Sequence, residues 1–159
     1  DLKSHILNQD IIYVGGGNTK SMLAVWKEWG LDLILEEAYQ EGIIMSGVSA
    51  GAICWFKKGI TDSWADHQAT IDCLGFVEGI CCPHYDEEPE RIPYVKDILT
   101  NKKIDSCLAI EGYTALHLID DKPAYSVSFG DKETDCHHVV YTNNIVDHTS
   151  IKNTVKINL

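Results

Sequence analysis

The fold is decided by the stretch Ile43-Ile-Met-Ser-Gly-Val-Ser-Ala-Gly-Ala52. Its first three residues form a short apolar run that predicts a buried strand. Gly47, Ser49 and Gly51 then fit the G-x-S-x-G pattern of a nucleophile elbow, in which a tight turn between a strand and a helix pushes a serine outward. Such a turn crowds the backbone on both sides, so only small neighbours fit. The stretch therefore predicts that Ser49 is a nucleophile and that a helix follows it over Ala50–Lys58.

A second glycine turn follows the apolar run Asp10–Val14, which also predicts a buried strand. Asn18 supplies N-cap chemistry for the helix that comes next, and a further helix is predicted over Leu31–Gln40. The turn Gly15–Gly17 lacks both the lysine of a P-loop and the full G-x-G-x-x-G spacing, so a dinucleotide site is disfavoured and no cofactor is expected. A backbone N–H that binds an oxyanion, paired with the N–H of Ala50, suits this turn better.

The rest of the chain continues the alternation of strands and helices up to residue 110. Gly59–Asp72 is polar and irregular and is expected to be a functional loop, Phe76–Pro83 contains a third strand, and Glu87–Thr100 is a helix led by acidic residues. Four later runs are expected to be strands, the later ones antiparallel: Cys107–Ile110, Ala115–Ile119, Ala124–Phe129 and His138–Tyr141. This order predicts an α/β fold with a parallel sheet between helical layers, and ligands bind at the carboxyl edge of such sheets.

A serine nucleophile needs a base, normally a histidine that a carboxylate holds in its tautomer. The chain has seven histidines. His84 directly follows the third strand, which places it at the same sheet edge as Ser49. His67, in the polar loop, is the next candidate by position. Three aspartates remain open as the orienting carboxylate: Asp62, Asp66 and Asp86.

Composition and charge exclude several classes of protein. A length of 159 residues argues for one domain, or two at most, and 45% hydrophobic against 23% charged residues is typical of a globular chain. The net charge of −11 disfavours nucleic acid and anionic membranes as partners. No transmembrane run and no secretory signal stand out, so a cytoplasmic protein is expected.

The six cysteines suit neither a disulfide framework nor a CxxC metal knuckle, because Cys81 and Cys82 are adjacent. Reduced thiols in a cytosolic enzyme are the expected state. Zinc held by Cys81, Cys82 and His84 is the alternative, but side chains at adjacent strand positions point to opposite faces of a sheet. No metal is therefore expected.

Three motifs together resemble the peptidase E family of serine peptidases, whose members include aspartyl dipeptidase. The motifs are Ile12-Tyr-Val-Gly-Gly-Gly-Asn-Thr19, Gly47-Val-Ser-Ala-Gly-Ala52 and Cys82-Pro-His-Tyr85, and they come in the family's order at similar spacings. The resemblance covers most of residues 8–120. It implies a three-layer α/β/α fold with a mostly parallel sheet, like that of class I glutamine amidotransferases, and a Ser-His-Asp triad.

The resemblance assigns roles to four residues: Ser49 as nucleophile, His84 as base, and the amides of Gly17 and Ala50 as the oxyanion hole. The family's loop aspartate falls best on Asp62. Asp86 stays the alternative, since its spacing from the histidine is like the His-x-Glu of the glutamine amidotransferases. The implied function is the hydrolysis of short peptides through an acyl-enzyme on Ser49.

The chain departs from the family pattern at its start. Family members carry further strand–helix units ahead of the first glycine-ended strand, and residues 1–159, taken as a single domain, have almost none there. We therefore expect an N-terminally incomplete domain, and an oligomer or an additional segment that covers the unpaired sheet edge. Aspartyl preference would need a cation, for which Arg91, Lys57 and Lys58 are the candidates.

Two other functions remain open. A serine esterase would use the same elbow, although the short stretch from Ser49 to His84 leaves little room for the strands and cap of an α/β-hydrolase. A catalytically inert binding module of the same fold would keep the turn for packing alone, and the presence of a full Ser, His and Asp set argues against it.

Overall fold

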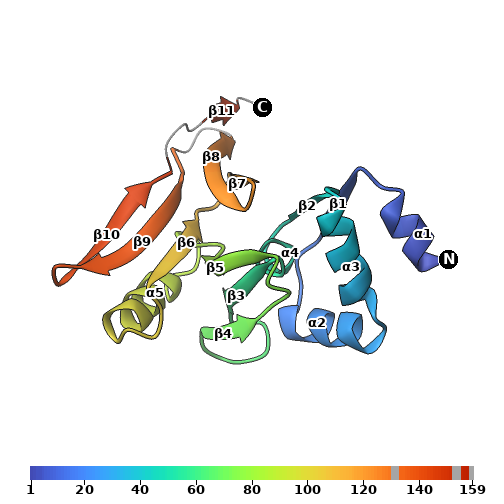
Figure 1. The fold of residues 1–159 in the computed structure, drawn as a ribbon. Helices are drawn as coiled ribbons and strands as arrows, with labels where there is room; N and C mark the ends of the chain where they lie inside the picture. Colours follow the sequence, from blue (N-terminus) through green and yellow to red (C-terminus); the bar gives the residue numbers. More distant parts are fainter. Residues whose placement is uncertain (130–132, 152–154, 158–159) are drawn as a thin grey trace. The chain divides into compact units, whose positions relative to one another are not determined.

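The structure is a computed structural model that describes residues 1–129, 133–151 and 155–157 (Figure 1). Its contacts cluster into two compact units, Asp1–Glu78 and Gly79–Leu159. The first unit contains α1 to α4, whereas the described part of the second is built mainly from strands.

The first unit pairs two short parallel strands with two longer helices. Its elements are α1 (Leu2–Leu7), β1 (Ile11–Val14), α2 (Thr19–Glu28), α3 (Leu31–Gln40), β2 (Ile44–Gly47), α4 (Ala50–Ile53), β3 (Phe56–Thr61) and β4 (Ala69–Asp72). β1 and β2 run in parallel, with Ile11 opposite Ile44 and Val14 opposite Gly47. The two strands that the sequence predicts around the glycine turns, and the helices that follow the first of them, are confirmed.

One face of the β1–β2 pair packs on the core of this unit. The core cluster contains Leu23 of α2, Leu35 of α3, and Cys54 and Trp55 after α4. Strand residues that alternate along β1 and β2 pack against it: Ile12, Val14 and Met45. The residues between them stay exposed, at 57% for Ile11, 67% for Tyr13 and 58% for Ile44.

The helix predicted over Ala50–Lys58 is wrong beyond its first turn. α4 ends at Ile53, and the chain enters β3 at Phe56. The reason is tertiary: a Cβ on Gly59 would lie 2.7 Å from the side chain of Ile53, so the glycine lets β3 pass directly over α4. β3 then pairs antiparallel with β4, where Lys58 lies opposite Asp72.

The prediction of an irregular loop over Gly59–Asp72 is therefore also wrong at both ends. Residues 59–61 belong to β3 and residues 69–72 to β4, which leaves only the connection between them without regular structure. Alternating burial in β4 follows the pattern of a strand with one covered face, a pattern that a run of only four residues shows weakly in the sequence.

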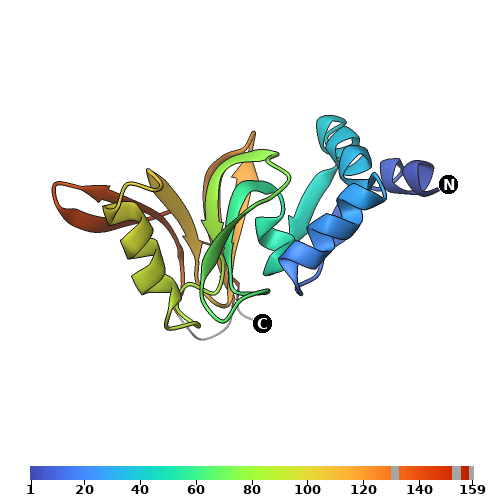
Figure 2. The same cartoon turned by 90° about the horizontal axis from the view of Figure 1, so that it is seen from below.

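The second unit contains most of the strands. Its elements are β5 (Val77–Cys82), which begins at the end of the first unit, α5 (Arg91–Thr100), β6 (Ser106–Ile110), β7 (Thr114–Ile119), β8 (Lys122–Phe129), β9 (Cys136–Thr142), β10 (Ile145–Ser150) and β11 (Val155–Ile157). β5 and β6 are parallel, whereas β6–β9, β9–β10 and β7–β8 are antiparallel, as the sequence predicts for the later strands. α5 packs against β9 and β10 in both views (Figure 1 and Figure 2).

The helix predicted over Glu87–Thr100 begins later, at Arg91. The N–H groups of Glu87 and Glu88 both donate to the carbonyl of His84, at 3.2 Å each, so this segment closes a tight turn instead. Pro89 adds a second reason, because a proline disfavours the helical conformation of the residue before it. The first turn of α5 consequently contains no acidic residue.

Helices and a mixture of parallel and antiparallel strands define an α/β fold, as predicted. The finer arrangement, three layers around a mostly parallel sheet, stays a prediction. No helix among the described residues is long and apolar enough to span a membrane.

Candidate active site

Ser49 lies at a sharp turn between β2 and α4. Its backbone has φ 57° and ψ −116°, which is unusual for a residue with a side chain. Strain of this kind costs of order 1–3 kcal/mol and persists where the surrounding structure enforces it. The predicted strand–serine–helix elbow is therefore present in the first unit, although its helix is only one turn long.

The two glycines of the motif are required by close backbone contacts. A Cβ on Gly47 would overlap the carbonyl oxygen of Gly51, and a Cβ on Gly51 would overlap the carbonyl oxygen of Val14. Both added atoms would lie far inside van der Waals contact. The glycines on either side of Ser49 thus allow the end of β2 and the start of α4 to contact each other and the end of β1.

The glycine turn after β1 lies directly beside Ser49. A Cβ on Gly16 would be 3.3 Å from the Cβ of Ser49 and 3.8 Å from its Oγ. Gly17 has φ 146°, a conformation that favours glycine. Ala50 is buried and is the first residue of α4, whose leading N–H groups have no acceptor within the helix. Gly17 thus belongs to the glycine turn beside Ser49, and Ala50 directly follows Ser49 in the chain; their role as the oxyanion hole stays a prediction.

Asp62 begins the connection between β3 and β4 in the first unit. The next residue, Ser63, accepts a hydrogen bond on its Oγ from the N–H of Thr19, at 3.1 Å, and its carbonyl accepts one from the side chain of Asn18. Asn18 also caps α2, since its side chain accepts from the N–H of Ser21 at 2.9 Å. The connection that carries Asp62 is thus tied to the residues that follow the glycine turn.

His84 belongs to the second unit and follows β5, as predicted. Its φ is 53°, and its side chain is 30% exposed. The ring Nδ1 lies 2.7 Å from Oε2 of Glu87, three residues further on, and the Glu87 side chain is 40% exposed. Sequence reasoning missed this partner, and the only signal for it was the His-x-x-Glu spacing, which becomes a contact only because the chain turns here.

Asp86, the alternative carboxylate, has a different partner. Its Oδ1 accepts a hydrogen bond from the N–H of Gly112 at 2.6 Å. This bond fixes the turn after β5 against the segment that follows β6. Ser49 and Asp62 lie in one unit and His84 in the other, so the predicted pairing of His84 with Ser49 or with Asp62 stays a prediction. Asp86 lies in the same unit as His84, and its predicted role as the orienting carboxylate likewise stays a prediction.

His67, the competing base, lies in the connection between β3 and β4. Its Nδ1 is 3.0 Å from Oδ1 of Asp66, and both residues are exposed. The hydrogen bond from His67 lowers the pKa of the Asp66 carboxyl. Asp66, the third aspartate that the sequence left open, therefore pairs with His67.

The three cations that the sequence nominates for an acidic substrate pair with carboxylates of the chain. Arg91 is only 3% exposed. The pairs are Arg91 with Glu88 at 2.7 Å, Lys57 with Glu78 at 3.0 Å, and Lys58 with Asp72 at 2.6 Å. Lys20 behaves differently, since its Nζ lies 5.5 Å from the ring centroid of Trp64.

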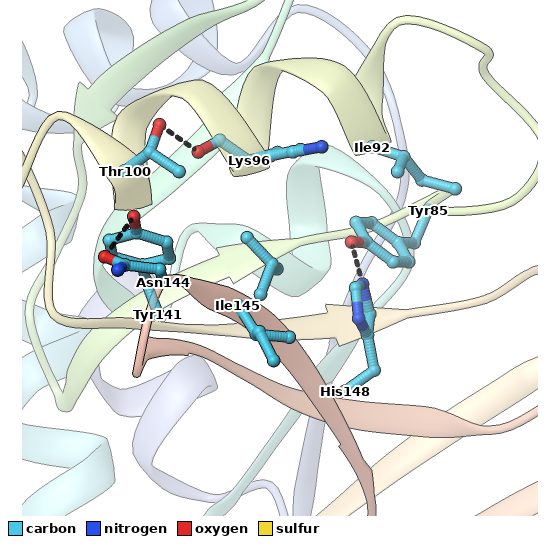
Figure 3. Close-up of a pocket in the computed structure, with 9 residues that line it drawn as sticks. Tyr85, Ile92, Lys96, Thr100, Tyr141, Asn144, Ile145 and His148 are labelled. Atoms are coloured by element: carbon cyan, nitrogen blue, oxygen red, sulfur yellow. Dashed lines mark hydrogen bonds between the residues drawn. The ribbon is translucent and has the colours of Figure 1, made fainter.

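A cavity of about 500 Å³ borders the turn that carries His84 (Figure 3). It lies between α5 and the β9–β10 hairpin, and Tyr85 and His148 line one end, where the Tyr85 hydroxyl is 2.7 Å from Nε2 of His148. Burial raises the pKa of the Tyr85 hydroxyl, so this group stays protonated. At the other end the hydroxyl of Tyr141 donates to Asn144. These polar groups are thus partly paired with one another.

All six cysteines are free thiols. Burial raises the pKa of Cys82 to about 12 and that of Cys136 to about 12, which keeps both thiols protonated and unreactive. Among the residues that the structure describes, no three His, Cys, Asp or Glu side chains are placed to hold one metal ion.

A strained serine between a strand and a helix, flanked by glycines in an α/β fold, is the arrangement of the serine hydrolases with a nucleophile elbow. The model of peptidase family S51 matches residues 1–125, and the chain belongs to this family. The resemblance to peptidase E that the three motifs indicate is thereby confirmed.

Three relatives carry the name of peptidases. The chain is 48% identical over 128 residues to the uncharacterized peptidase YgaJ of Bacillus subtilis (strain 168), which covers 80% of this chain and 55% of the relative. It is 33% identical over 86 residues to the uncharacterized peptidase Lin0382 of Listeria innocua serovar 6a, covering 50% and 41%. For the uncharacterized peptidase Lmo0363 of Listeria monocytogenes serovar 1/2a the identity is 30% over 95 residues, covering 56% and 46%. The chain spans about half the length of these relatives.

Proposed function

We propose that this chain is a serine peptidase of family S51 that hydrolyses short peptides through an acyl-enzyme on Ser49. The observation that carries the proposal is the backbone of Ser49, whose φ of 57° is held between β2 and α4 by the contacts of Gly47 and Gly51. A fold that needed only a turn here would be more stable with a glycine at this position, because glycine adopts positive φ without strain. The retained side chain therefore supports a catalytic role.

In the proposed reaction, Ser49 is the nucleophile and His84 is the general base. His84 Nε2 removes the proton of the Ser49 hydroxyl as Oγ attacks the carbonyl carbon of the peptide. The N–H groups of Gly17 and Ala50 bind the oxyanion of the tetrahedral intermediate, and each such donor contributes roughly 10²–10³ in rate. The imidazolium then protonates the leaving amine, and water, deprotonated by the same histidine, hydrolyses the ester. A carboxylate must hold the Nδ1 proton of His84, and the sequence nominates Asp62 or Asp86 for this role.

Short peptides are proposed as substrates because the family consists of peptidases and because the acidic chain suits neither nucleic acid nor anionic membranes. A preference for aspartyl peptides is not part of the proposal, since the net charge of −11 repels acidic substrates and the cations Arg91, Lys57 and Lys58 each pair with a carboxylate. A cytoplasmic location, with thiols reduced, completes the proposal.

A fluorophosphonate probe tests the nucleophile. We expect stoichiometric labelling of Ser49, detected by peptide mass mapping, and no labelling or hydrolysis in Ser49→Ala. Ser46→Ala is the matched control, because Ser46 lies in β2 and its hydroxyl donates to the carbonyl of Ile12 at 3.0 Å. Full peptidase activity in Ser49→Ala would refute the mechanism, and hydrolysis of esters without hydrolysis of any peptide in a mixed panel would make the protein an esterase.

A further inference from the structure

We propose that the cavity between α5 and the β9–β10 hairpin binds a small carboxylate with an apolar body, and that Lys96 pairs with this carboxylate. The ligand is a monoanion that carries no positive charge beside its carboxylate. This site lies beyond the proposed function, because it uses neither Ser49 nor His84 and would stand if the chain hydrolysed no peptide.

The walls of the cavity come from one helix and one hairpin of the second unit. Ile92, Lys96 and Thr100 are four residues apart, so they share one face of α5, and this helix packs against β9 and β10. Ile145 and Val146 of β10 line the cavity as well (Figure 3). The volume of about 500 Å³ lies within the range of ~300–1,000 Å³ that small-molecule sites have.

Part of the apolar wall is still accessible to water. Ile92 is 44% exposed and Ile145 is 65% exposed. A ligand that covered these side chains would remove apolar surface from water, which favours binding. The cavity therefore suits a ligand with an apolar body.

The charge of the lining differs from that of the whole chain. None of the nine described residues that line the cavity is Asp or Glu, although the chain has 24 such residues against 13 Lys and Arg. Lys96 adds an ammonium to this lining. An anion would thus meet a cation and no carboxylate here, on a molecule whose net charge of −11 otherwise repels anions.

The ammonium of Lys96 has no carboxylate within ion-pair distance among the residues that the structure describes. Four other lysines do have one, and the pairs are Lys3 with Glu37, Lys57 with Glu78, Lys58 with Asp72, and Lys103 with Asp97. Asp97, the neighbour of Lys96 in the chain, is therefore paired elsewhere. In Figure 3 the ammonium of Lys96 lies on the side of Ile92 and Tyr85, away from Thr100.

The end of the cavity beyond Ile92 supplies hydrogen-bond donors and no negative charge. The hydroxyl of Tyr85 lies 2.7 Å from Nε2 of His148. Burial raises the pKa of this hydroxyl, so it stays protonated. Carboxylate oxygens only accept hydrogen bonds, so they suit an end that has hydroxyl and ring N–H groups.

These features define the chemical class of the ligand. A single ammonium matches a single negative charge, and the rings of Tyr85 and Tyr141 beside the aliphatic wall suit an aromatic body. A free amino acid is disfavoured, because no carboxylate in the lining can pair with its α-ammonium. A simple aromatic acid and an N-blocked amino acid both have the required chemistry.

Calorimetric titration of the 159-residue chain tests the ligand class with two matched pairs of probes. The pairs are phenylacetate with phenylacetamide, and N-acetylphenylalanine with phenylalanine. We expect saturable binding of phenylacetate and N-acetylphenylalanine, and binding at least ~10-fold weaker for their partners, because hydrogen bonds to charged groups contribute this much. The tighter of the two acids identifies the source, a simple acid or an N-blocked amino acid.

Three outcomes of this titration would overturn the proposal. They are equal binding of phenylacetamide and phenylacetate, tighter binding of phenylalanine than of its N-acetyl form, and no saturable binding of either acid.

Lys96→Met tests the residue that holds the carboxylate. Methionine keeps the apolar stem of the side chain and removes the charge, and Lys96 is exposed, so we expect the variant to fold. Lys122→Met in β8 is the matched control, because it removes the same charge outside the cavity. We expect phenylacetate to bind Lys96→Met at least ~10-fold more weakly and Lys122→Met as it binds the wild type. Wild-type affinity in Lys96→Met, or equal losses in both variants, would refute the role of Lys96.

Amide chemical shifts in ¹⁵N-labelled protein locate the ligand. We expect phenylacetate to shift the signals of Tyr141, Ile145 and His148, which line the cavity, and not that of His67 in the first unit. Ser49→Ala should bind phenylacetate like the wild type, whether or not Ser49 is a nucleophile. Shifts confined to the first unit, or loss of binding in Ser49→Ala, would place the ligand elsewhere and overturn the proposal.

Discussion

At the scale of single residues, the feature that distinguishes this chain is the strained backbone of Ser49. Glycine adopts a φ of 57° freely, whereas a residue with a Cβ adopts it at a cost. The close backbone contacts of Gly47 and Gly51 hold the turn in this conformation. Val48, between Gly47 and the serine, is 46% exposed and therefore contributes little to the constraint.

A glycine variant is usually less stable than the alanine variant at the same position, and the strain at Ser49 predicts the opposite order there. Ser49→Gly should be more stable than Ser49→Ala by about 1 kcal/mol, because only the alanine retains a Cβ at positive φ. At Ser46, which has no positive φ, the glycine variant should be the less stable of the two. Urea unfolding of the four variants measures this. If the alanine variant is the more stable one at position 49 as well as at position 46, Ser49 is not strained.

At the scale of elements, the junction of β1, β2 and α4 positions the nucleophile. Its tightest contact joins Gly51 to the end of β1, where an added Cβ would overlap the carbonyl oxygen of Val14 and lie 2.8 Å from that of Gly15. Both atoms belong to the backbone, so neither can move aside without shifting the strand.

Gly51→Ala should therefore destabilise the protein by at least ~3 kcal/mol, at the upper end of the cost of overpacking. Gly15→Ala is the matched control, because a Cβ there has no neighbour within 4 Å and the backbone has no positive φ. Denaturant midpoints give the comparison. Equal stability of the two variants would mean that the junction is looser than the structure indicates.

At the scale of the whole molecule, buried and half-buried thiols make the free energy of unfolding depend on pH in the alkaline range. Burial raises the pKa of Cys73, Cys82 and Cys136 to about 12 each. Between ~9 and 12 the unfolded chain releases these protons and the folded chain keeps them, so stability falls as pH rises. Each thiol contributes up to ~1.4 kcal/mol per pH unit.

We expect the free energy of unfolding to change little from about pH 7 to 8 and to fall steeply above about pH 9. Because lysines and tyrosines also titrate there, Cys136→Ala provides the control. Its stability should fall less steeply with pH, by the contribution of one thiol. Identical slopes for the variant and the wild type would contradict the burial of Cys136.

The exposed face of the β1–β2 pair bears on association. Ile11, Tyr13 and Ile44 lie on this face and are each more than half exposed. We predict that the 159-residue chain self-associates through it, since proteins normally cover such surfaces. Light scattering across a dilution series should show an oligomer, and Tyr13→Lys should shift it toward the monomer. A wild-type monomer at every concentration would refute this.

Local chemistry let the sequence by itself determine the strands before both glycine turns, the helices of Thr19–Gln40, and the elbow at Ser49. In each case the signal lies within a few residues of the chain. The spacing of the glycines indicates the positions at which two backbone segments come into close contact. The pattern also put His84 directly after a strand, where the structure has it behind β5, and its role as the base stays a prediction.

Only the tertiary structure decided the rest. α4 stops at Ile53 because the chain that follows it forms β3, which pairs with β4 and packs over α4 at Gly59. A local helical pattern contains no sign of these two contacts. The partner of His84 depended on the turn that brings Glu87 back to the imidazole and on the space left by Gly112, which lies beyond β6 in the chain. A side chain's neighbours across a fold are set by packing, which no local pattern records.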